Sequence, residues 1–184
     1  QEDVFAVLED VLPPIFAKFG TYNVASSAPF RRIAYRDAME TYGSDKPDLR
    51  IDLEIQDITA EVQGCGFTPF EGATVKAVAV DNFTQARKWI DKLLADCEVQ
   101  SGSKAYWFKA DENGQLAGGI AKFVQPIKEQ VVSALNLKAN DFVALSAGAL
   151  GAAQKTAGVL VKTLGAAVPG HMDKEQYAFC WIVD

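Results

Sequence analysis

The sequence has 184 residues, of which 49% are hydrophobic and 23% charged, and its formal net charge is −6 at pH 7. These values are typical of a globular protein, and no apolar run approaches the roughly 18 residues of a membrane span. Three widely spaced cysteines and one histidine argue against a zinc site or a disulfide framework, and favour free thiols in a reducing cytoplasm. Because Gln1 is an unusual first residue, we expect a piece of a longer protein.

The first predicted element is a helix over residues 3–19, which Gly20 would end. Pro13 and Pro14 remove two backbone donors, so we expect a kink or two short helices. The apolar residues recur at helical spacing and are Val4, Leu8, Val11, Ile15 and Phe19, widened by Phe5, Leu12 and Phe16.

A loop over residues 21–30 and a short helix over residues 35–42 lead to a second, charged loop, Tyr42–Arg50. Gly43 permits a positive φ, and Pro47 excludes the preceding residue from the α region. A loop fixed in this way holds charged side chains in place, which suits binding; the alternative is a solvated turn.

The densest group of basic residues in the sequence surrounds this loop. A solvated charged face and a contact with phosphate groups both explain such a group. Its members are Arg31, Arg32, Arg36, Lys46 and Arg50.

After Arg50, short strands and helices alternate. The predicted elements are a helix within 55–62, a strand beginning at 67–70, a strand over 75–80, a helix capped by Asn82 and reaching Cys97, a strand over 105–109, a hairpin turn at 111–114, a helix from Pro126 to Leu135, a strand over 141–146, and a helix from Leu150 to Leu164 ended by Gly165. The hairpin and the short spacings favour an α+β fold over a doubly wound sheet.

Three local patterns that suggest chemistry have simpler structural explanations. The segment 148–156 is placed like a phosphate-binding loop, but Gln154 occupies the position where a Walker loop needs glycine. His171 lies in a segment without apolar periodicity, which predicts a mobile surface histidine. The aromatic residues 106–108 lack interleaved Lys or Arg, so we expect them in the core rather than stacked on bases.

The order of residues in three segments resembles bacterial-type aspartyl-tRNA synthetases. Residues 29–50 (PFRRIAYRDAMETYGSDKPDLR) resemble the segment of that family that ends in YGSDKPDLR. Residues 118–123 (GGIAKF) and 177–184 (YAFCWIVD) resemble two later segments. The resemblance therefore covers the chain from end to end.

This resemblance implies a fold and a domain division. We expect an α+β fold with a mostly antiparallel sheet covered on one face by helices, namely an insertion domain containing the GAD domain, flanked by pieces of a class II catalytic domain. The implied domains are residues 1–51 (catalytic), 52–172 (insertion) and 173–184 (a strand that returns to the catalytic domain).

The resemblance also implies a function for the parent protein: a cytoplasmic, homodimeric ligase that activates L-aspartate with ATP and Mg²⁺ and transfers it to tRNA. The chain lacks the family's Phe-Arg-x-Glu segment, its other ATP-binding segments and its dimer motif. We therefore expect no catalytic residue, metal ligand or bound cofactor in this piece. Whether the parent charges only tRNA-Asp or also tRNA-Asn stays open.

The candidate nucleic-acid-binding residues are Asp45, Lys46 and Arg50. Lys46 or Arg50 would meet a phosphate, and Asp45 would fix one of them; the alternative is that Asp45 and Arg50 pair with each other and pin a hinge. A different role is a protein-interaction module that docks a tRNA-dependent amidotransferase. The net negative charge predicts that the insertion domain alone binds RNA weakly.

Overall fold

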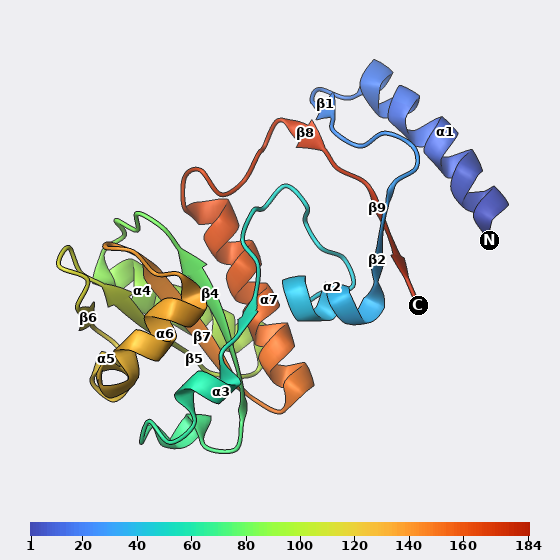
Figure 1. The fold of residues 1–184 in the computed structure, drawn as a ribbon. Coiled ribbons are helices and arrows are strands. Elements are labelled where there is room, and N and C mark those ends of the chain that lie inside the picture. The colour runs from blue at the N-terminus through green and yellow to red at the C-terminus, as the bar shows by residue number, and fades with distance from the viewer.

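The computed structural model describes all of residues 1–184 and has two parts, a layered α+β part and a smaller part that carries both termini (Figure 1). The smaller part pairs the beginning of the chain with its end. Strand β1 lies parallel to β8, and β2 lies parallel to β9. Its elements are α1 (Glu2–Phe19), β1 (Asn23–Val24), β2 (Arg31–Ala34), α2 (Tyr35–Tyr42), β8 (Gln176–Tyr177) and β9 (Cys180–Val183).

The layered part is built on a five-stranded sheet in the order β3-β4-β7-β5-β6, in which every pair is antiparallel. Its elements are β3 (Gln56–Asp57), α3 (Thr59–Val62), a 3-10 helix (Thr68–Phe70), β4 (Thr74–Val80), α4 (Arg87–Ser101), β5 (Ala105–Ala110), β6 (Leu116–Ala117), α5 (Ala121–Val124), a second 3-10 helix (Gln125–Ile127), α6 (Lys128–Leu135), β7 (Phe142–Gly148) and α7 (Leu150–Ala167).

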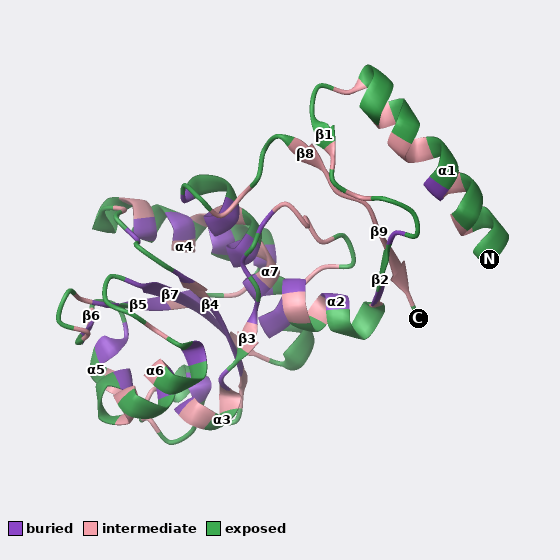
Figure 2. Ribbon diagram, turned by 45° about the horizontal axis from the view of Figure 1, so that its top comes forward, coloured by how far each residue is buried: buried purple, intermediate pink, exposed green.

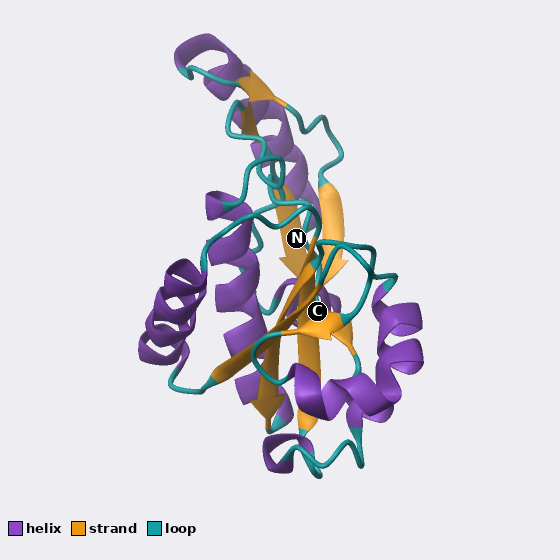
Figure 3. Ribbon diagram, turned by 90° about the vertical axis from the view of Figure 1, so that its left-hand side faces the viewer, coloured by secondary structure: helices purple, strands orange, loops and turns teal.

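The central strands contribute side chains to two cores, one on each face of the sheet. Val78 and Val80 of β4 belong to the core that also contains residues of α4 and α7. Val75 and Ala77 of the same strand belong to the core that contains residues of α3, α5 and α6. Figure 3 shows helices on both sides of the strands.

The α+β class and the mostly antiparallel sheet are confirmed, whereas the expectation that helices cover only one face is corrected. Strands that are apolar at consecutive positions have no face suited to water, so both faces need a cover. Phe142, Val143, Ala144 and Leu145 of β7 are all fully buried. The run of apolar residues in β7, rather than an alternating pattern, was the signal in the sequence.

Helix α1 is a single helix through Pro13 and Pro14, so it is not divided into two short helices. Aromatic contacts on both sides of the prolines explain its continuity. Phe5 stacks on Trp181 with ring centroids 4.2 Å apart, and Phe16 meets the ring of Phe179 at 5.1 Å. Both halves of the helix are thus held against the same C-terminal segment.

The face that α1 buries is narrower than the predicted apolar stripe. Glu9 is buried and accepts hydrogen bonds from the backbone N–H of Phe30 (3.0 Å) and the indole N–H of Trp181 (2.7 Å). Half of the stripe faces outward, and Figure 2 shows α1 largely exposed. The exposed residues of the stripe are Val4, Val11, Ile15 and Phe19.

Three other element boundaries differ from the prediction. Residues 68–70 form a 3-10 helix instead of a strand. Helix α4 begins at Arg87 rather than behind Asn82, whose φ of 47° is left-handed and not the extended conformation of an N-cap. Helix α7 continues past Gly165 to Ala167.

The remaining sequence-based expectations concern the hairpin, the aromatic strand and the cysteines. Strands β5 and β6 form the predicted hairpin, and Trp107 and Phe108 lie in the core. All three cysteines are free, with Cys97 buried. None of the helices is both long enough and apolar enough to cross a membrane.

Helix α7 packs against the sheet through Leu160, which is fully buried, whereas Leu150 in its first turn is exposed. We predict that Leu160→Ala lowers the free energy of unfolding by about 2–5 kcal/mol, because it removes buried methyl groups and leaves a cavity. Leu150→Ala is the control in the same helix and should change it little. Urea denaturation of both variants measures the difference, and a loss below about 0.5 kcal/mol for Leu160→Ala would show that this face is not packed.

Candidate nucleic-acid interface

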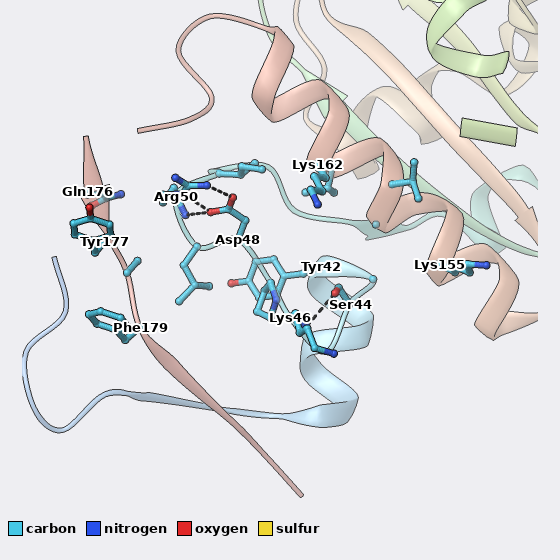
Figure 4. Close-up of a pocket in the computed structure, with 18 of the residues that line it drawn as sticks. Tyr42, Ser44, Lys46, Asp48, Arg50, Lys155, Lys162, Gln176, Tyr177 and Phe179 are labelled. Carbon is cyan, nitrogen blue, oxygen red and sulfur yellow. Dashed lines mark hydrogen bonds and ion pairs between the residues drawn. The ribbon is translucent and has the colours of Figure 1, made fainter. Parts of the chain in front are cut away.

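The loop Tyr42–Arg50 forms one wall of a cavity of about 690 Å³. Helix α7 forms the opposite wall, and residues 176–179 of the returning segment close a third side (Figure 4). Two candidate residues, Lys46 and Arg50, line this cavity, whereas Asp45 does not.

The loop begins where α2 and α7 touch through their backbones. Gly43 ends α2 with φ 64°, and its N–H donates to the carbonyl of Met39 (3.1 Å). A Cβ added to Gly158 of α7 would lie 2.6 Å from the carbonyl oxygen of Gly43, closer than side-chain carbons approach in real structures. The glycine pair therefore fixes the start of the loop against α7.

Inside the loop, each charged candidate residue pairs with a near neighbour in sequence. Lys46 Nζ lies 2.9 Å from the Asp45 carboxylate, and 84% of the Lys46 side chain is exposed. Arg50 makes two bonds to Asp48, from Nε (2.8 Å) and from Nη2 (2.7 Å). The alternative in which Asp45 pairs with Arg50 is therefore wrong.

These ion pairs keep the loop charged. Hydrogen bonds from Arg50, and after them the charges of Arg50 and Lys162, hold the pKa of Asp48 below its ordinary value although burial opposes this. The bond to Asp48 raises the pKa of Arg50, and the bond from Lys46 lowers the pKa of Asp45. Since the Lys46 pair is exposed and joins adjacent residues, it contributes little to stability and leaves Lys46 available to a ligand.

A buried lysine holds α2, and with it the loop, against the sheet. Lys76 of β4 is 1% exposed and makes ion pairs with Glu40 of α2 and with Asp57 of β3, the latter at 2.9 Å. The side-chain amide of Gln154 on α7 donates to the same Glu40 carboxylate (2.9 Å). One group of four side chains therefore connects α2, β3, β4 and α7.

The charges of this group are mutually stabilised. The hydrogen bond from Lys76 lowers the pKa of Glu40. Burial raises the pKa of Asp57, but bonds from Thr59 and Lys76 outweigh it and the net shift is downward. Burial likewise opposes the charge of Lys76, and its two carboxylate partners raise its pKa above the ordinary value.

Two segments connect the layered part to the smaller part, and they lie side by side at residues 51–52 and 171–172. Ile51 pairs with Met172 in an isolated antiparallel bridge, and the N–H of Asp52 donates to the carbonyl of His171 (3.2 Å). His171 is 11% exposed and lies between the carboxylates of Asp52 (2.8 Å) and Asp81 (3.2 Å), so the expectation of a mobile surface histidine is wrong. This contact lies at the predicted domain boundaries, but the division itself stays a prediction.

The basic residues of the sequence do not form one surface. Arg32 pairs with Glu2, and Arg36 pairs with Asp37 at 3.0 Å, and neither lines the cavity. Instead, the basic residues that line the cavity are Lys46 and Arg50 of the loop and Lys155 and Lys162 of α7. Neither lysine was predicted, because both follow the loop by more than a hundred residues; the available signal was their seven-residue spacing, which places both on one side of a helix.

Comparison with known proteins agrees with this description. Residues 1–184 match the family model of tRNA synthetases class II (D, K and N), so the chain belongs to this family. It is 38% identical over 187 residues to the aspartate–tRNA ligase of Streptomyces coelicolor, covering 100% of this chain and 31% of that protein.

Two further relatives have similar names. The chain is 37% identical over 191 residues to the aspartate–tRNA(Asp/Asn) ligase of Zymomonas mobilis, of which it covers 32%. It is 39% identical over 183 residues to the aspartate–tRNA ligase of Streptococcus suis, with 96% of this chain and 31% of that protein covered. The resemblance to bacterial aspartyl-tRNA synthetases is thus confirmed, and the chain spans about a third of the length of these relatives.

The ion pairs of Lys76 predict how stability depends on pH. The lowered pKa values of Glu40 and Asp57 contribute stability that is present above the ordinary carboxyl pKa, about 4, and is lost as pH falls through the lowered values. As the pH falls from about 5 to about 2, the unmodified chain should therefore lose about 1 kcal/mol more stability than the Lys76→Met variant. The difference is small because solvent screens both half-exposed carboxylates.

Urea denaturation at several pH values tests this expectation. Lys138→Met is the control, because Lys138 is exposed and forms no ion pair. Parallel pH profiles for Lys76→Met and the unmodified chain would contradict the assignment of acid sensitivity to this group.

Proposed function

We propose that the chain is part of an enzyme, an aspartate–tRNA ligase, that activates L-aspartate with ATP and transfers the aspartyl group to tRNA. The observation that carries the proposal is the identity of 37–38% over the whole chain to ligases of this name. The segment YGSDKPDLR, from which the resemblance was first seen, forms a preorganised cavity wall. We further propose that the complete enzyme is a cytoplasmic homodimer.

Magnesium is proposed for the complete enzyme only. When bound, the ion would neutralise phosphate charge on ATP during activation. No three His, Cys, Asp or Glu side chains of this chain gather in a way that could hold a metal ion. We therefore assign this chain no step that uses the ion.

Within the enzyme, the role proposed for this part is to contact tRNA. Lys46 extends from a loop whose start is fixed by Gly43 and whose turn is held by a bond from the Lys46 N–H to Ser44 Oγ (3.0 Å). Arg50 is held by Asp48 with its side chain 35% exposed. The backbone at these two residues therefore has little conformational entropy left to lose on binding a phosphate, which favours binding. Asp45 acts by orienting Lys46.

The 184-residue chain alone should not catalyse aspartate-dependent exchange of pyrophosphate into ATP. The reason is that its sequence contains none of the family's ATP-binding segments. Radiolabelled exchange assays on repurified chain measure this, with the complete enzyme as the positive control. Exchange that scales with the amount of the 184-residue chain would refute the prediction.

In the complete enzyme, Lys46→Ala should raise the tRNA KM several-fold at moderate salt and leave the melting temperature unchanged, because the exposed pair with Asp45 adds little stability. Arg50→Ala should raise KM as well, but it also breaks the bidentate bond to Asp48 and should lower the melting temperature. Initial rates of tRNA charging and thermal unfolding are the measurements. Unchanged charging by both variants, per folded enzyme, would leave the loop with a structural role only.

A further inference from the structure

Helix α7 presents two lysines to the cavity from the side opposite the loop. Lys155 and Lys162 are exposed and line the cavity. Neither takes part in an ion pair, in contrast to Arg87 and Lys92 of α4, each of which pairs with an aspartate one turn further along. Figure 4 shows Lys162 facing Asp48 and Arg50 across the cavity.

The cavity is a locally positive region on an acidic protein. Four cations line it, Lys46, Arg50, Lys155 and Lys162, against one lining carboxylate, Asp48, with the Asp45 carboxylate next to Lys46 just outside the lining. Asp48 is already engaged by both nitrogens of Arg50 that face it. The chain as a whole has a net charge of −6, so its own charge distribution directs an anion to this place rather than to the surface at large.

The spacing of the two lysines favours a polyanion over a single small anion. They are seven residues apart on one helix, which is about 10 Å along its axis. Several phosphates along a chain can span this distance, whereas a single phosphate is much smaller than it. Lysine is a flexible point charge, which suits contacts to a phosphate backbone that carry no sequence information.

Both walls of the cavity are anchored to the rest of the structure. The side of α7 opposite the lysines is buried through Ala157, Leu160 and Leu164. The loop is fixed to the same helix where Gly43 meets Gly158. Ligand binding to such a preformed site has little ordering cost.

We propose that Lys155 and Lys162 of α7, together with the loop Tyr42–Arg50, form a binding site for the phosphate backbone of RNA. That this RNA is tRNA rests on the proposed function. The site extends the predicted loop contact to a second element, and it makes the insertion helix, not only the loop, part of the tRNA-binding surface.

The test compares two double variants of the complete enzyme. Lys155→Gln/Lys162→Gln removes both charges from the cavity. Lys122→Gln/Lys138→Gln removes the same charge from exposed positions in α5 and after α6, on the opposite face of the sheet. Fluorescence anisotropy with labelled tRNA at several salt concentrations gives Kd and its salt dependence, and charging assays give KM and kcat.

The cavity variant should bind tRNA at least several-fold more weakly at about 0.1 M salt. A plot of the logarithm of the association constant against the logarithm of salt concentration should become less steep by about one for each lysine lost. KM for tRNA should rise with little change in kcat or melting temperature. The control variant should match the unmodified enzyme. Equal binding by the two double variants would overturn the proposal.

Two outcomes separate this site from the function on which it rests. If the enzyme charges tRNA with aspartate but both double variants bind alike, the site is wrong and the proposed function stands. If the enzyme does not charge tRNA with aspartate, the function is wrong and the binding titration alone decides on the site; absence of tRNA binding then overturns it. Displacement of tRNA by inorganic phosphate at equal ionic strength would show a single-phosphate site and would also contradict the proposal.

Discussion

The arrangement of the candidate interface depends on one buried charge. Lys76 lies in the middle of β4 at 1% exposure, where an unpaired ammonium group would be costly. Its partners come from two other elements, Glu40 of α2 and Asp57 of β3, and Gln154 of α7 binds Glu40 as well. Satisfying one lysine thus requires α2 to lie against the layered part in one orientation, and α2 leads directly into the loop.

The cavity exists because two further contacts agree with this orientation. Gly43 and Gly158 allow the backbones of α2 and α7 to touch. At the other end of the loop, Asp173 donates its N–H to the carbonyl of Arg50 (2.9 Å), next to the bridge between Ile51 and Met172. The loop is therefore held at both ends, and the charged side chains between them have fixed starting points.

Much of the fold could be predicted from the sequence, because its signals are local. The DENG turn predicted the β5–β6 hairpin, and apolar periodicity predicted α7. The errors arose where distant parts of the chain decide. Aromatic partners at residues 177–181 hold α1 as one continuous helix through its prolines, and the second apolar face of β4 and β7 needs a second helical layer.

The candidate site shows the same division between local and distant information. The charged residues of the loop were visible in the sequence, but the partner of Arg50 was not predicted, since Asp48 and not Asp45 binds it. The roles of Lys76, Lys155 and Lys162 were not visible, because each depends on an element far away in sequence. The lysine in the TVKAVAV strand was nevertheless a signal, since a charge between residues buried on both faces of a sheet needs partners.

The charge distribution is compatible with the proposal that this acidic chain binds RNA. The affinity of a protein for a phosphate backbone depends on the cations that contact it, and acidic residues beyond about one Debye length, roughly 8–10 Å in physiological salt, are largely screened. The paired arginines Arg32 and Arg36 add little, since each has a carboxylate of its own. Lys155 and Lys162 of α7 form no ion pair, so a phosphate can neutralise them without breaking one, and they line the cavity where the two parts of the molecule meet.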